Sequence, residues 1–152
     1  MLHYESVAQV KPSAIHVITR EIVAINRQWW RGTFGLDASE EERPAILSGK
    51  TALFHTQGIS DADDVFMAFA DADYILERLG DWAKRFKVKW RIRMREDDWG
   101  AVDPTGMTRP LFDQMTKWSS RAGVYRGGKP CWSVPEGRRT ELLARYAGRK
   151  EV

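Results

Sequence analysis

The acid and base side chains that could carry catalysis lie in one stretch of the chain. His55 precedes a turn-rich segment, and Asp71 and Asp73 follow the apolar run VFMAFA, which is typical of a buried strand. Ligands often bind beyond strand ends in α/β sheets, where paired carboxylates can share a proton. A protein that used His55 with Asp71 or Asp73 as an acid–base pair would be a small hydrolase or transferase. We favour a structural role instead, with Asp71 as a helix N-cap and Asp73 in the first helical turn.

No stretch of the sequence carries a motif that names a reaction. The three histidines lack a metal-ligand spacing, and no serine lies in a Gly-x-Ser-x-Gly elbow. Cys131 is the only cysteine, so no internal disulfide can form, which fits a reducing compartment. We therefore expect no metal, no cofactor and a cytoplasmic location, and we favour a non-enzymatic function over an enzymatic one.

Charge is unevenly distributed along the chain. Residues 1–80 hold 7 Lys or Arg against 12 Asp or Glu, a net charge of −5, whereas residues 81–152 hold 17 against 9, a net charge of +8. Such asymmetry can mark a surface for an acidic partner, or it can mean that the two halves fold against each other. The sequence leaves both interpretations open.

The basic residues that could bind a partner fall in two places. The segment 88–95 alternates apolar and basic residues, which predicts a half-buried strand with a wholly basic outer face: Lys89, Arg91, Arg93 and Arg95. A loop at 126–130, RGGKP, adds Arg126 and Lys129 around two glycines whose amides could approach a phosphate. The strand face could equally be a solvated sheet surface.

Tryptophan is the most unusual component, with seven residues in the chain. Four of them belong to apolar faces and are predicted to pack in the core: Trp29, Trp82, Trp90 and Trp118. Trp99 and Trp132 fall at turns or element ends instead. Aromatic side chains exposed beside charge are typical of binding surfaces.

These features predict a non-enzymatic domain for protein–protein interaction or an adaptor. Its candidate binding residues are Lys89, Arg91, Arg93, Arg95, Trp99, Arg126, Lys129 and Trp132. The alternative is a nucleic-acid-binding protein that uses the basic strand face and the RGGKP loop. Sheets that bind RNA carry stacking aromatics on the exposed face, whereas Trp90 is predicted to point inward. The partner and the oligomeric state stay open.

The elements that must position these residues predict an α+β fold. We expect a small mixed sheet of about 4–6 short strands packed against about 4–5 helices, with a central strand–helix–strand unit at 64–95 in which the two strands pair in parallel. Further helices are predicted at 12–30, 40–48, 109–122 and 136–147. Further strands are predicted at 51–56, around 99–102 and on either side of the loop at 126–130.

Length and composition predict a single soluble globular domain over residues 1–152. The chain is 43% hydrophobic and 30% charged, too apolar for intrinsic disorder. Residues 1–11 lack the basic start and apolar run of a secretory signal, and no apolar stretch is long enough to cross a bilayer. We therefore expect no membrane association.

Overall fold

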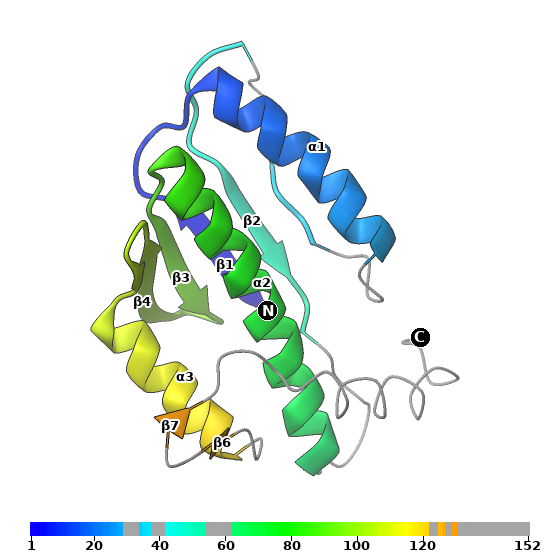
Figure 1. Ribbon diagram of the computed structural model, residues 1–152, viewed down its shortest axis with the longest axis vertical. Helices are drawn as coiled ribbons and strands as arrows, with labels where there is room; N and C mark the ends of the chain where they lie inside the picture. Colours follow the sequence, from blue (N-terminus) through cyan, green and yellow to red (C-terminus); the bar gives the residue numbers. More distant parts are fainter. Residues whose placement is uncertain (29–33, 38–41, 54–61, 122–124, 127–128, 131–152) are drawn as a thin grey trace. The chain divides into compact units, whose positions relative to one another are not determined.

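The computed structural model describes residues 1–28, 34–37, 42–53, 62–121, 125–126 and 129–130 (Figure 1). The chain forms two compact units, the first from residues 1–52 and 76–111 and the second from residues 53–75 and 112–152. Helices α2 (Ala62–Phe86) and α3 (Arg109–Arg121) each run from one unit into the other. The single domain over residues 1–152 stays a prediction.

The first unit is built on a five-stranded sheet in which all neighbouring strands are antiparallel. Its strand order is β2 (Ser48–Thr51), β1 (Leu2–Ser6), β3 (Trp90–Met94), β4 (Asp97–Asp103) and β5 (Gly106–Met107). The described residues also form three helices, fewer than the 4–5 predicted, while the predicted α+β class and the strand number of the sheet are confirmed. The predicted mixed sheet is wrong, because no parallel pair occurs in the part of the chain that the structure describes.

The predicted strand at 65–70 is wrong, since this run lies inside α2. A short apolar run cannot be assigned by periodicity, because a buried helix and a buried strand both produce it. The structure continues the helical stripe backwards through it, with buried residues at spacings of 3, 4, 3 and 4: Phe69, Ala72, Leu76, Leu79 and Ala83. The place beside β3 in the sheet is taken by β1 instead. Asp71 therefore lies within the helix and is not its N-cap.

The end of α2 explains how a helix passes into a strand with almost no loop. Lys87 adopts a φ of 57°, and the Val88 N–H donates to the Ala83 carbonyl across 3.2 Å, as in a Schellman motif. Glycine is the usual residue at this left-handed position, because an L-residue there costs about 1–2 kcal/mol. The turn at Lys87 reverses the chain direction, so that β3 begins at Trp90.

Strand β1 was not predicted, although its sequence alternates as a strand should. Leu2, Tyr4 and Ser6 are buried, and they share a sheet face with Trp90 of the neighbouring strand. This face is covered by α2, which lies across the sheet (Figure 1), and the rings of Trp82 and Trp90 are 6.4 Å apart.

Helix α1 (Pro12–Gln28) confirms the prediction of a helix at 12–30 over its described part. Its residues Ile15 and Ile18 are fully buried. Phe34, in the segment after the helix, packs against Trp82 with ring centroids 5.6 Å apart, and its backbone exchanges two hydrogen bonds with Asn26 at 2.9 and 3.0 Å. These contacts hold the chain after α1 against the core.

The predicted helix at 40–48 is wrong over its described residues, 42–48. Ala45 forms an isolated β-bridge with Val10, and Gly49 lies within β2. A Cβ on Gly49 would overlap the Gly35 carbonyl oxygen, so this glycine allows close strand contact and does not end a helix. The predicted strand at 51–56 overlaps β2 only at Thr51, and residues 54–56 lie outside the described residues.

The second unit contains the beginning of α2, most of α3 and a short hairpin. Phe69 of α2 meets Trp118 of α3 edge to face, with ring centroids 5.6 Å apart. Helix α3 confirms the helix predicted at 109–122 over its described residues. Strands β6 (Tyr125–Arg126) and β7 (Lys129–Pro130) pair antiparallel, so a hairpin is present, but its strands include residues of the predicted loop at 126–130. The predicted helix at 136–147 lies outside the described residues. Among the described helices, none is long and apolar enough to span a bilayer.

Candidate functional site

The face of the five-stranded sheet opposite the core, here called the outer face, is charged and exposed to solvent. Alternation along the strands places His3 and Glu5 of β1, Lys50 of β2, and Arg91 and Arg93 of β3 on this face. All of them are exposed except His3, which is half-buried. One-sided burial is usual for antiparallel sheets, so exposure alone does not identify a binding surface.

Three basic side chains lie directly opposite one another across three strands of the outer face. His3 pairs with Lys50 on one side and with Arg93 on the other, and we call these three residues the cationic row. Burial lowers the pKa of His3, and the positive charges of Arg93, the N-terminal amine and Lys50 lower it further. Like charges directly opposite in a sheet are destabilising. The uncharged form of His3 is therefore favoured, and Lys50 and Arg93 carry the positive charge of the row.

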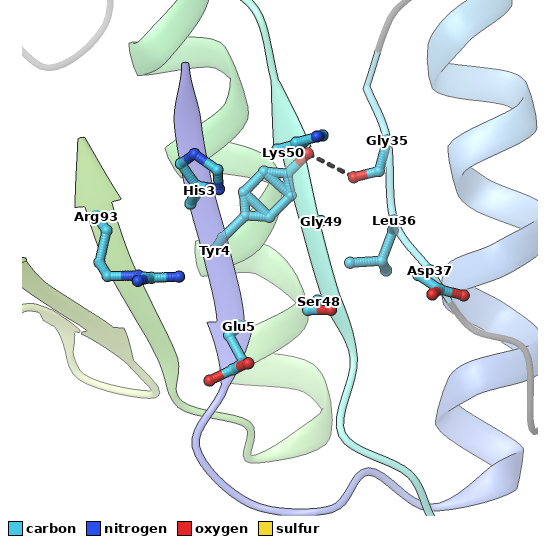
Figure 2. Close-up of a pocket in the computed structure, with 10 residues that line it drawn as sticks. All are labelled: His3, Tyr4, Glu5, Gly35, Leu36, Asp37, Ser48, Gly49, Lys50 and Arg93. Atoms are coloured by element: carbon cyan, nitrogen blue, oxygen red, sulfur yellow. Dashed lines mark hydrogen bonds between the residues drawn. The ribbon is translucent and has the colours of Figure 1, made fainter. Parts of the chain in front are cut away.

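A pocket of about 640 Å³ opens beside the cationic row, between β1, β2 and the segment 34–37 (Figure 2). Figure 2 shows His3 and Lys50 toward one end of the pocket and Glu5 and Asp37 toward the other. Arg93 also lines it, from the β3 side. The pocket is thus basic at one end and acidic at the other.

The wall of this pocket is held by hydrogen bonds to the sheet. The Tyr4 hydroxyl donates to the Gly35 carbonyl oxygen across 2.5 Å, so the Thr51 hydroxyl must donate to Tyr4 across 2.7 Å. Burial raises the pKa of Tyr4 well above its ordinary value, and the phenol therefore stays protonated. The Asp37 N–H donates to the Ser48 carbonyl across 2.7 Å. The segment 34–37 is in this way fixed along the edge of β2.

The predicted basic strand face is present and exposed, but acidic residues accompany it. Arg91 forms an ion pair of 3.3 Å with Asp98 of β4, and Asp98 also pairs in register with Arg93. Lys89 directly precedes β3, and Arg95 lies in the β3–β4 turn with a φ of 57°. The predicted wholly basic face is therefore a mixed one once its neighbouring strand is included.

The structure describes three of the four other predicted binding residues. Trp99 is half-buried at an irregularity of β4, between the pairs Ile92–Gly100 and Arg93–Asp98, and it has contacts within the chain. Arg126 and Lys129 pair with each other in the β6–β7 hairpin of the second unit. Trp132 lies outside the described residues.

The predicted acid–base pair is only partly described. Asp71 and Asp73 are buried in α2, with exposed fractions of 1% and 5%, and both have interactions within the chain. His55 lies outside the described residues, so its approach to these carboxylates stays a prediction. Within the described part of the chain, no three His, Cys, Asp or Glu side chains gather closely enough to hold a metal ion.

Sequence reasoning missed three residues of the outer face: His3, Glu5 and Lys50. The signal was present in LHYES at 2–6, where Leu2 and Tyr4 alternate with polar residues. Lys50 was missed because the residues before it were predicted to form a helix at 40–48, which Gly49 would end. Comparison of the chain with protein-family models, with curated proteins and with solved structures finds no match in any of the three.

Proposed function

We propose that this protein is a non-enzymatic binding domain that recognises a segment of another protein on the outer face of its sheet. The observation that carries the proposal is the cationic row, which lies at the basic end of a pocket whose opposite end is acidic. A cytoplasmic location, suggested by the single cysteine Cys131, belongs to the same proposal.

The cationic row supports a bound acidic group. Burial and the flanking cations Arg93 and Lys50 lower the pKa of His3, so the free protein favours an uncharged His3 between two cations. A carboxylate placed among Lys50, His3 and Arg93 would accept charge-assisted hydrogen bonds from the two cations and would favour the protonated form of His3. At the other end, Glu5 and Asp37 would attract a basic group of the same segment.

The mixed charge of the outer face favours a polypeptide over a nucleic acid. A phosphate backbone that followed Lys89, Arg91, Arg93 and Arg95 would also meet Asp98, which already pairs with Arg91. Repeated phosphates are best matched by a uniformly basic surface, whereas a protein segment can alternate charges to match this one. Nucleic-acid binding is the alternative, and it predicts an affinity that falls more steeply as the salt concentration rises.

A peptide-binding assay with charge-reversal variants tests the proposal. Short labelled peptides of equal length would carry an acidic group followed by a basic one, the reverse order, or only neutral residues, and fluorescence polarisation would report affinity at low and physiological salt. The double variant Lys50→Glu/Arg93→Glu is expected to lose roughly tenfold or more in affinity for the preferred peptide.

Lys117→Glu is the matched control, because Lys117 is an exposed cation on α3 that does not line this pocket. The proposal fails if Lys50→Glu/Arg93→Glu binds all peptides as the wild type does. A single-stranded oligonucleotide in the same assay decides the alternative. Tighter binding to it than to any peptide, with affinity falling steeply as salt rises, would favour nucleic-acid binding.

A further inference from the structure

A second pocket in the first unit, separate from the outer-face pocket, has a different chemistry. It has a volume of about 420 Å³ and lies between the connection from β1 to α1 and the connection from α2 to β3. These connections are joined by a hydrogen bond of 2.9 Å from the Val7 N–H to the Lys89 carbonyl oxygen, and Figure 1 shows them side by side. The pocket is therefore framed by two segments that the sheet holds in place.

The lining of this pocket combines three cations with an apolar surface. Lys11, Lys87 and Lys89 line it, and none of its lining residues is acidic. Most of the remaining lining is apolar, including Val10, Ala14 and Phe86. A pocket of this composition matches an anion that carries an apolar body.

The backbone conformation of Lys87 supports a binding role for its side chain. Its φ of 57° lies in the region that glycine occupies at helix ends, yet the chain carries a long cationic side chain there. That side chain is exposed, and the described residues offer it no ion pair or hydrogen bond. Strained residues gather at functional sites, where the side chain justifies the strain. The backbone of Lys87 thus ends α2 at an energetic cost, while its side chain forms no ion pair or hydrogen bond among the described residues that would offset this cost.

The surroundings leave most of this positive charge available. Helix α1 begins at the pocket without an acidic residue in its first turn, so its dipole adds to the positive field. Asp103 is the nearby carboxylate: its pKa is lowered mainly by hydrogen bonds from the Thr105 hydroxyl and N–H, and only slightly by Lys89. Asp103 is therefore engaged chiefly with its own turn.

We infer that this pocket binds a phosphate monoester with an apolar or aromatic body. Lys11, Lys87 and Lys89 would hold the phosphate, and the apolar body would lie against Val10, Ala14 and Phe86. A phosphate monoester carries nearly two negative charges at neutral pH, which suits three lysines better than a single carboxylate does. Two sources offer this group: a free metabolite, and the headgroup of phosphatidic acid at a membrane surface. This inference is independent of peptide binding at the outer face.

Phenyl phosphate is the probe, and NMR titration of the full chain is the measurement. It is expected to bind more tightly than inorganic phosphate, which lacks the apolar body, and than phenol, which lacks the charge. The amide shifts are expected to gather at residues 7–14 and 86–89. Absence of phenyl phosphate binding, or equal affinity for phenyl phosphate and inorganic phosphate, would overturn the inference.

Lys87→Gly distinguishes a loss of binding from a loss of stability. The substitution removes the cationic side chain and also removes the strain of an L-residue at a positive φ. It is expected to weaken phenyl phosphate binding roughly five- to tenfold while the Tm rises by about 1–4 °C. Lys87→Ala is expected to lose the same affinity without the gain in Tm. Lys84→Ala, one turn earlier on α2 and outside the pocket lining, is expected to bind as the wild type does. Wild-type affinity in both Lys87 variants would overturn the inference.

Vesicles of phosphatidylcholine with and without phosphatidic acid identify the source of the phosphate. Lys87-dependent binding to the phosphatidic acid vesicles, added to phenyl phosphate binding, assigns the site to a lipid headgroup. Phenyl phosphate binding without vesicle binding assigns it to a soluble ester. Vesicle binding that is equal in the wild type and in Lys87→Gly would contradict a lipid site in this pocket.

Discussion

Replacing Glu21 with alanine should destabilise the first unit, because Glu21 satisfies a buried donor. Glu21 of α1 accepts a hydrogen bond of 2.9 Å from the indole N–H of Trp82, a side chain only 1% exposed. It also forms a two-pronged ion pair with Arg85, at 2.7 and 2.8 Å. One carboxylate thus joins α1 to α2 by two different kinds of interaction.

The two interactions differ in their expected energy. A buried donor left without a partner costs about 1–3 kcal/mol, which makes the Trp82 bond the larger contribution. The ion pair is exposed, with side chains 41% and 35% accessible for Arg85 and Glu21, so solvent screening limits it to about 0.2–1 kcal/mol. We expect Glu21→Ala to lower the free energy of unfolding by about 2–3 kcal/mol, and the Tm by roughly 4–12 °C.

Urea unfolding followed by far-UV circular dichroism measures this loss. Glu21→Gln keeps an oxygen acceptor for Trp82 and loses only the charge, so it should cost less than about 1 kcal/mol. Asp81→Ala removes the other carboxylate of Arg85, at 2.9 Å, without touching Trp82, and should cost about 0.3–0.5 kcal/mol. If Glu21→Ala costs no more than Asp81→Ala, the reasoning about the buried indole is wrong.

Two further predictions concern acid stability and a tight turn. Hydrogen bonds from Arg85 lower the pKa of Glu21 below its ordinary value near 4.5, so its contribution is complete above that value and is lost as pH falls through the folded-state pKa. The unfolding free energies of wild type and Glu21→Gln should therefore converge as pH falls below about 4.5. Gly100→Ala should cost more than Gly106→Ala in urea unfolding, since both have a positive φ, of 113° and 124°. Only at Gly100 would a Cβ come 2.7 Å from the Thr108 hydroxyl, and an equal cost would refute the packing argument.

Periodicity identified the elements that have one solvated face. Apolar residues alternate in the strand around 88–95 and recur every three or four residues in the helices at 12–30 and 109–122. They do so because one side of each element is buried and the other faces solvent. The hairpin partner around 99–102 followed from turn residues alone. For these segments the local pattern carried enough information.

Periodicity failed where the pattern is uniform or too short. The run at 65–70 is apolar throughout, so helix and strand fit equally until the neighbours are known. Gly49 has the residue type of a helix end, but the close approach of the Gly35 carbonyl explains it, and that contact joins segments distant in sequence. Asp71 has the residue type of a cap and lies inside a helix.

The sequence by itself determined the α+β class, the basic side of β3 and the burial of Trp82, Trp90 and Trp118, because each depends on residue type and local spacing. Only the tertiary structure decided that β1 and not the run at 65–70 lies beside β3, and so that His3 falls between Lys50 and Arg93. Strand order is set by which faces can be buried together, a property of the whole sheet. Both pockets arise in the same way, from segments brought together by packing.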